Sequence, residues 1–563
     1  MTNPIGSVPA LIAVLLTAAT VQAPDIRYVV RPVVRDALVE LDITVSFTGE
    51  ASGRTAVRMP SDRFGAANMH RFIREIEVST DAVTRQVAGD SVMLIEHAPG
   101  ADLTVRYVLR YDSAAAGFVA YGPSVSDKHF HFLGSQWMVR LGSPDNIRRV
   151  EVRTERGGLA GPFAGSFGLD PGSHTLEASQ NELDWSVIAG GGYREHRFAC
   201  EGRPVVTLVQ GAFAVPDDSI FSMAERIACG QRRIFNDYTQ PFYAIVLTAR
   251  ERLRAGASFL NAFACFARPA SDASQLAALL AHEMTHAWLP RKLRLVPGPG
   301  EVVPTADFSW FHDIRYDWFH EGFTEYLSRL LQVRTGLASD DWFVQRLNED
   351  FAQLAVHPYA TTSAYELEQA AIAGRYTNLH QRLSYLRGAL LAFRWDATIR
   401  RASGDTLDIM EAVRRLLAAA ASTNGRLPRP AFEHALTQLG VSAAYDVEHV
   451  ALGGEPIRVD ALAPGPDWML TFDTIPAFEP GFDVVASINA DTIMGVREPG
   501  AAWAAGLRNG MPIVRHSNAQ RWNASWRADL PMTIVVRQDG RERTVEFHAV
   551  RGGLAVPHFV RRD

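Results

Sequence analysis

The sequence has few cysteines, no long basic run and no internal apolar run long enough to cross a bilayer. Its three cysteines, Cys200, Cys229 and Cys265, form no CxxC pair, which excludes a disulfide framework. One bridge between Cys200 and Cys229 fits this count, and three buried free thiols are the alternative. The net charge is −6, so the sequence gives no reason to expect a nucleic acid or an anionic membrane surface as a partner.

The N-terminus is the one apolar segment that stands out. Residues Val8 to Ala23 are apolar or small and uncharged, which is short for a membrane span and typical of the core of a signal peptide. We therefore expect a signal peptide over residues 1–23 and export to the periplasm or the extracellular space. No Lys or Arg precedes the segment and Pro24 would follow the cut, so cleavage after Ala19 and an uncleaved anchor stay as alternatives.

Length and periodicity predict a multidomain α+β protein. At roughly 150 residues per domain, 563 residues give about three or four domains. Alternating apolar residues predict an N-terminal β-sandwich-like domain over 24–210, and helical periodicity predicts a mostly helical domain over 211–450. Residues 451–563 begin with a Pro- and Gly-rich linker and return to short strands, with a hairpin about Asp539–Gly540. The expected helices of the middle region are Ser271–Leu289, Trp318–Thr335, Ser384–Ala402 and Asp408–Ser422.

The clearest chemical motif is His282-Glu283-Met284-Thr285-His286. On a helix capped by Asp272, the spacing of four places His282 and His286 on one face, so both imidazoles can bind one ion. Glu283 lies about 100° further round the helix and can reach a water at the metal without being a ligand. The motif alone also arises by chance on surface helices, and the capped apolar helix around it favours a metal site.

A third ligand is expected on a following helix, at Trp318–Tyr326. Glu321 is the predicted carboxylate ligand, and Gly322 would let another backbone come close. Glu325 lies one turn later and is placed to accept the outer N–H of a ligating histidine. A solvated Glu325, and His320 as the ligand in place of Glu321, remain as alternatives.

A second pair of histidines, His129 and His131, lies in Lys128-His129-Phe130-His131. Alternate residues of a strand share a face, so this pair could also chelate an ion. Because nothing nearby supplies a further ligand, an ordinary strand is the favoured interpretation.

These motifs together resemble the glycyl aminopeptidase family, zinc peptidases of the thermolysin-like superfamily that often end in a PDZ domain. The resemblance rests on the HExxH segment with Arg291-Lys292 after it, on WFHEGFTEYL from Trp318, on Tyr385-Leu386-Arg387-Gly388 and on the Gly506–Gly510 turn. It implies a thermolysin-like catalytic domain that binds Zn²⁺, with Glu321 as the third ligand. It further implies that Tyr385 donates to the oxyanion of the tetrahedral intermediate.

One segment departs from the family pattern. Related aminopeptidases carry a G-G-L-E-H-like segment before the HExxH helix, where a carboxylate helps to hold the substrate amine. Here Gly256–Phe263 offers only Ser258 and Asn261 as polar side chains. Hydrolysis is expected to survive this change, whereas selection of a free N-terminus is in doubt unless Glu301 or Asp307 supplies the charge.

The sequence therefore predicts a zinc metallopeptidase, aminopeptidase-like, with Glu283 as general base and Tyr385 as oxyanion stabiliser. Its partners are a peptide or protein substrate and a peptide ligand of the PDZ-like domain, bound by strand addition. Glu479–Phe482 is either the carboxylate-binding loop of that domain or a plain turn. The alternatives are a zinc hydrolase acting on non-peptide amides or esters, and a non-catalytic PDZ protein with a relic metal site.

Overall fold

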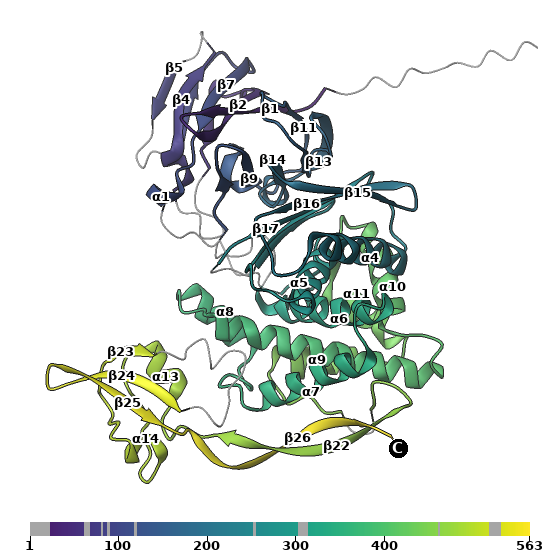
Figure 1. Ribbon diagram of the computed structural model, residues 1–563, viewed down its shortest axis with the longest axis vertical. Coiled ribbons are helices and arrows are strands. Elements are labelled where there is room, and N and C mark those ends of the chain that lie inside the picture. Colours follow the sequence, from purple (N-terminus) through teal and green to yellow (C-terminus); the bar gives the residue numbers. More distant parts are fainter. Residues whose placement is uncertain are drawn as a thin grey trace, which may run out of the picture.

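The computed structural model describes residues 23–60, 68–79, 83–86, 91–116, 121–251, 255–301, 314–459, 462–516 and 531–562. The expected signal segment lies outside these residues apart from Ala23. Among the helices of the described residues, none combines the length and the apolar character needed to cross a bilayer. Three regions follow one another along the long axis of the molecule: N-terminal sheets, a central sheet with helices, and a C-terminal group of strands (Figure 1).

The N-terminal region is built of sheets, as the alternating sequence predicts. Leu41, Ile43 and Val45 of one long strand are fully buried and face a shared core, because alternate side chains of a strand point to the same side. A six-stranded sheet has the order β13(Gly172–Ala178)-β11(Arg148–Thr154)-β1(Ile26–Arg35)-β2(Leu38–Thr48)-β7(Asp102–Leu109)-β4(Ile73–Val78). Two four-stranded sheets accompany it: β10(Arg140–Leu141)-β3(Arg54–Arg58)-β6(Val92–Glu96)-β5(Val83–Gln86) and β12(Phe163–Gly165)-β14(Val187–Gly191)-β9(His129–Leu133)-β8(Ser124–Val125).

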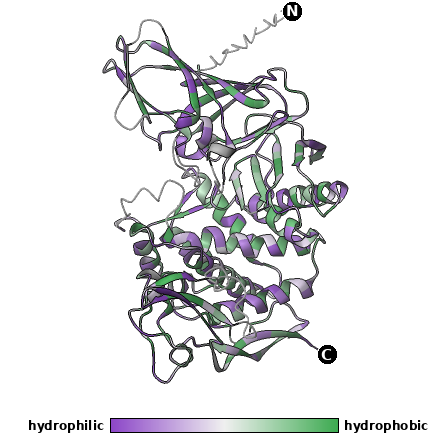
Figure 2. Cartoon of the chain, turned by 60° about the vertical axis from the view of Figure 1, so that its left-hand side comes forward, coloured by the Kyte–Doolittle hydropathy of each residue, from purple (hydrophilic) through white to green (hydrophobic). Residues whose placement is uncertain are grey.

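A central sheet continues across residue 210, where periodicity placed the change from strands to helices. Its order is β15(Arg194–Cys200)-β16(Arg203–Gln210)-β17(Tyr243–Ala249)-β19(Ala262–Ala267)-β18(Ala255–Phe259). The strands β16, β17 and β19 run parallel and are buried on both faces, so they show continuous apolar runs instead of alternation. Figure 2 shows these central strands coloured mainly as hydrophobic. The last strand, β18, forms an edge of the sheet.

Helices cover this sheet and form the rest of the middle region. The four expected helices are present, and the third begins six residues earlier than expected, at Asn378, after Thr377 as its N-cap. The helices are α4(Asp217–Phe235), α5(Ala273–Thr285), α6(Thr324–Arg334), α7(Asp340–Ala355), α8(Ala364–Ile372), α9(Asn378–Ser403), α10(Ile409–Ala421) and α11(Arg429–Thr437). A π-helical segment, η4(Trp318–Phe323), leads directly into α6.

The C-terminal region contains a ribbon and a small sheet. The ribbon pairs β22(Trp468–Phe478) with β26(Val550–Arg561) and lies along α7 (Figure 1). The small sheet has the order β23(Ile513–His516)-β24(Met532–Gln538)-β25(Arg541–Phe547), with the short helices α13(Val484–Asn489) and α14(Ala501–Ala504) beside it. The predicted hairpin is confirmed, since Asp539 and Gly540 join β24 to β25 with φ of 51° and 75°, the left-handed pair that a two-residue turn requires.

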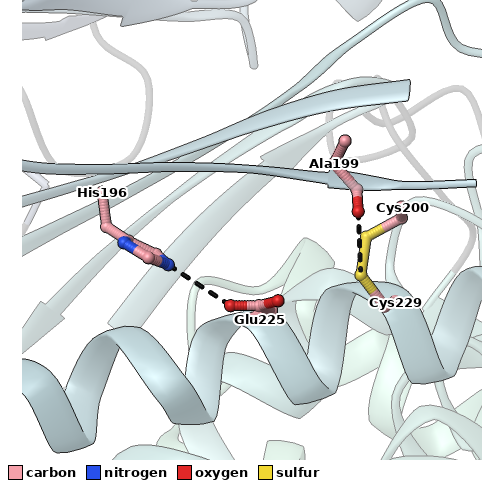
Figure 3. The surroundings of a disulfide bond; sticks show 5 residues. All are labelled: His196, Ala199, Cys200, Glu225 and Cys229. Carbon is pink, nitrogen blue, oxygen red and sulfur yellow. Dashed lines mark hydrogen bonds and ion pairs between the residues drawn. A yellow bond between two sulfur atoms is a disulfide. The ribbon is translucent and has the colours of Figure 1, made fainter. Parts of the chain in front are cut away.

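A disulfide between Cys200 and Cys229 joins the end of β15 to α4 (Figure 3). Close by, His196 of β15 and Glu225 of α4 form a second link, with Nε2 and Oε2 3.3 Å apart. Cys265 is a buried free thiol. The bridge was one of two alternatives left open by the cysteine count, and it fixes α4 against the central sheet.

Candidate active site

The HExxH motif occupies the last turns of α5, a helix that is held at both ends. Asp272 caps its start by accepting from the backbone N–H of Gln275 (2.8 Å), and the Gln275 side chain accepts in return from Asp272 (3.2 Å). Near its end, Gln231 of α4 donates to the carbonyl of Ala281 (2.7 Å). The helix that carries His282, Glu283 and His286 is therefore braced by the helix that the disulfide fixes.

Three ligand atoms meet beside this helix. Nε2 of His282 and Nε2 of His286 are 3.1 Å apart, and Oε2 of Glu321 lies 3.4 Å from the first and 3.5 Å from the second. In the described part of the chain, His282, His286 and Glu321 form the one cluster of at least three potential ligands that could hold a metal ion.

The hydrogen bonds of the two imidazoles fix the protons of the site. Nδ1 of His286 donates to the carbonyl of Leu289 (2.7 Å), and Nδ1 of His282 donates to Oε2 of Glu325 (3.1 Å). Each Nε2 therefore presents a lone pair to the other. Oε2 of Glu321 is buried and faces both Nε2 atoms. Three facing lone pairs repel one another unless a cation lies between them.

The geometry fits zinc. Tetrahedral ligands at about 2.0–2.1 Å from a zinc ion lie about 3.3–3.4 Å from one another. The three observed separations of 3.1, 3.4 and 3.5 Å bracket that value. Two imidazoles and one carboxylate leave the fourth position of a tetrahedron open, as catalytic zinc sites require.

Two glycines bring Glu321 next to Tyr385. Glu321 lies on η4, and a Cβ added at Gly322 would be 2.4 Å from the Cα of Gly388 on α9. A Cβ at Gly388 would be 1.7 Å from the carbonyl oxygen of Trp318, so any larger residue at either position would separate η4 from α9. The close approach that we expected at Gly322 is therefore made by α9. Single π-turns of this kind often occur at functional sites.

Tyr385 lies beside the ligands. Its ring stacks on that of His282, with centroids 5.7 Å apart and an angle of 11° between the planes. Burial and the nearby charge of Glu321 raise the pKa of Tyr385 well above its usual value. The hydroxyl therefore keeps its proton and can act as a donor.

Glu325 belongs to a charge network behind His282 whose other members, Arg329 and Asp350, are buried. Its Oε1 accepts from Nη2 of Arg329 (2.8 Å), and Arg329 also binds Asp350 of α7. Burial opposes ionisation of Glu325, but the Arg329 guanidinium outweighs it, so the pKa of Glu325 lies well below its usual value. Glu325 is thus not a solvated surface charge, and as a carboxylate it orients the His282 ring.

A cleft of about 690 Å³ opens at this site. Glu283, which is 7% exposed, lines it together with Gly256 and Tyr385. Tyr121 also lines the cleft and reaches it from the N-terminal region, where its carbonyl accepts from Gln136. No sequence pattern marks Tyr121, because it lies in an irregular segment far from the motif.

The two rival histidine assignments are wrong. His320 points away from the ligands, since its Nε2 accepts from the backbone N–H of Leu295 (3.1 Å) and the residue is fully buried. The ring nitrogens of His129 interact with Ser124 and Ser126. His131 is buried beside Phe266 instead, so the strand pair forms no metal site among the described residues.

The segment that departs from the family pattern forms β18 and the start of β19. Ser258 and Asn261 are 2% and 3% exposed, and Asn261 donates to the carbonyl of Ser166 (3.1 Å), so neither lines the cleft. Glu301 accepts from Tyr316 (3.3 Å) and does not line it either. Asp307 lies outside the described residues.

A protein-family model matches the segment of the chain that contains the site residues. Residues 275–391 match the family model of the M61 glycyl aminopeptidases. The match confirms the family resemblance for the motifs between the HExxH segment and Tyr385–Gly388, and it does not extend to the Gly506–Gly510 turn. Together with the three converging ligand atoms, it supports a metallopeptidase with peptide substrates.

Three solved structures of low sequence identity match the chain. An aminopeptidase N family protein from Idiomarina loihiensis has a TM-score of 0.69 at 14% identity, over 96% of this chain and 98% of that one. An M1 zinc metallopeptidase from Deinococcus radiodurans has a TM-score of 0.48 at 16% identity, over 78% and 95%. Yeast LTA4 hydrolase with bestatin has a TM-score of 0.47 at 12% identity, over 77% and 69%. No curated protein sequence matches the chain. The first of these matches shows that the chain has a multidomain α+β architecture with an aminopeptidase N-like fold.

Proposed function

We propose that this chain is a zinc-dependent metallopeptidase, aminopeptidase-like, that hydrolyses peptide bonds in the cleft beside α5. The observation that carries the proposal is the convergence of three lone pairs, from His282, His286 and Glu321, next to a cleft that Glu283 lines. A relic site would not need to keep both the ligands and the acid beside them.

The residues divide the chemistry among them. Zinc held by the two histidines and Glu321 would polarise a carbonyl group and acidify a water molecule. Glu283 is placed to take a proton from the attacking water and to pass it to the leaving amine. Tyr385 keeps its proton and donates a hydrogen bond to the developing oxyanion.

The edge strand β18 is the proposed binding site for the substrate backbone. β18 is the outermost strand of the central sheet, and its residues Ala255 and Gly256 line the cleft. A peptide can add to such an edge through main-chain hydrogen bonds. Small residues there leave room for the peptide backbone close to Glu283.

Metal analysis and digestion of a peptide library test this function together. We expect about one zinc per chain and cleavage of peptides that stops on removal of zinc and returns when it is restored. Turnover of esters or modified amides with no peptide cleavage would favour the non-peptide hydrolase. Peptide binding without hydrolysis of any of these would favour the relic site.

We further propose that a blocked substrate N-terminus reduces cleavage little. The stretch Gly256–Phe263 brings no acidic side chain to the cleft, and a neutral amide attracts an ammonium far more weakly than a carboxylate does. Matched peptides with free and acetylated N-termini decide this. A loss of more than about a hundredfold on acetylation, about 2.7 kcal/mol, would show a real amine site and contradict the proposal.

Two predictions about the ends of the chain stay proposals. Export is supported by the Cys200–Cys229 bridge, since disulfides persist in oxidising compartments, and an intact Met1 on the protein isolated from cells would contradict cleavage.

The PDZ-like domain, residues 451–563, is supported by the β24–β25 hairpin. One observation argues against a carboxylate-binding loop at Glu479–Phe482. Strand addition needs an edge strand after the loop, whereas helix α13 follows it. Titration with C-terminal peptides tests that loop, and no binding would leave the plain turn.

A further inference from the structure

Gly256 of the edge strand makes direct contact with the side chain of the proposed base. A Cβ added at Gly256 would lie 2.1 Å from Cδ of Glu283, 2.3 Å from its Cγ and 2.5 Å from its Oε1. All three distances are far below van der Waals contact, which is about 3.5–4.0 Å for carbon atoms. The φ of Gly256 does not lie in the left-handed region, so the glycine is needed for space and not for its backbone conformation.

The two backbones on either side of this contact are both held in place. Gly256 pairs with Cys265 of β19 inside the central sheet, and Cys265 is buried. Glu283 lies between the two histidine ligands on α5, which Gln231 of α4 braces at Ala281. A shift of α5 away from β18 would carry His282 and His286 with it. An added methyl group at position 256 must therefore displace the Glu283 side chain.

We propose that Gly256 is a positioning residue that seats the carboxylate of Glu283 against the edge strand. This inference rests on the proposed function and adds a reason for the glycine beyond room for substrate. To restore normal contact with a Cβ at 256, the carboxyl carbon of Glu283, now 2.1 Å away, would have to move by about 1.4 Å or more. A general base works within about 2.6–3.2 Å of the proton that it takes, and a misplacement of about 1 Å can lower the rate by about a hundredfold.

A kinetic double-mutant cycle tests the link between the two residues. We expect Gly256→Ala to lower kcat by about a hundredfold, with zinc content unchanged and KM within about threefold of wild type. In the Glu283→Gln background the same change should cause no further loss, because the base is already gone. Losses that multiply in the double variant, or a loss carried wholly by KM, would show that the methyl group blocks substrate and would overturn the proposal.

A stability cycle tests the contact without any catalysis. Gly256→Ala should lower the melting temperature by a few degrees, as overpacking does, and should lower it no further when Glu283→Ala has emptied the space. Equal falls in both backgrounds would overturn the proposal. If the wild-type protein hydrolyses no peptide, the proposed function fails, and this cycle still decides whether Gly256 seats Glu283.

Gly172→Ala is the matched control for both cycles. Gly172 begins strand β13 in the N-terminal region, and nothing lies within 4 Å of a Cβ added there. The control should leave kcat, KM and the melting temperature unchanged. If Gly172→Ala lowered kcat or the melting temperature as much as Gly256→Ala does, the effect would come from replacing a strand glycine in general, and the proposal would be overturned.

Discussion

Glu325→Gln tests the charge behind the proposed metal site. The glutamine side chain can still accept from Nδ1 of His282, which lies 3.1 Å from Oε2 of Glu325, but it carries no negative charge. It also removes one of the two carboxylates that hold Arg329, the other being Asp350. Loss of such an outer carboxylate typically lowers metal affinity 10- to 100-fold. We therefore expect the zinc dissociation constant to rise by that factor, about 1.4–2.7 kcal/mol.

Competition with a chromophoric chelator at neutral pH measures this dissociation constant on the folded protein. Glu349→Gln is the control, since Glu349 also lines the cleft but pairs with Arg346 (2.7 Å) and Gln345 (3.1 Å). It should leave zinc affinity unchanged. A rise of less than about twofold for Glu325→Gln, or an equal rise in the control, would refute the role of Glu325 in orienting His282.

Two further changes probe other parts of the molecule. Tyr385→Phe removes one hydroxyl beside His282 and should lower kcat by about 10²–10³-fold with folding nearly unchanged; steady-state kinetics that show wild-type kcat would rule out the oxyanion role. Burial opposes ionisation of Asp237, but Lys292 and Thr239 lower its pKa from 3.8 to about 2. The ionised carboxylate therefore stabilises the fold at pH values above 3.8, and this contribution is lost as the pH falls toward 2. Asp237→Asn should therefore lower the free energy of unfolding by about 2 kcal/mol near pH 7 and by much less near pH 2; an equal loss at both values, from denaturant titrations, would contradict the assignment.

Local pattern was enough to predict the elements that depend on neighbours in sequence. The cap at Asp272, the helix that carries His282 and His286, and the turn at Asp539–Gly540 all follow from residues within a few positions of one another. The central sheet was harder to place, because β16 pairs with β17 across residue 210 and buried parallel strands do not alternate.

The same division holds for the site. Glu321 and Glu325 share one helical segment, so their spacing could be read from the sequence. Tyr121 and Gly256 reach the cleft from separate segments, and no local pattern marks a contact that only the fold creates. Gly256 was noted only for the carboxylate missing from its segment, and its contact with Glu283 appears when β18 and α5 pack together.

Peptide turnover per bound zinc, in the wild type and in Glu283→Gln, tests the central claim most directly. Glu283 is placed as the base and not as a ligand, so both proteins should hold about one zinc per chain. Turnover of the variant should fall by at least about a hundredfold. Zinc retained with turnover within about tenfold of wild type would contradict the account.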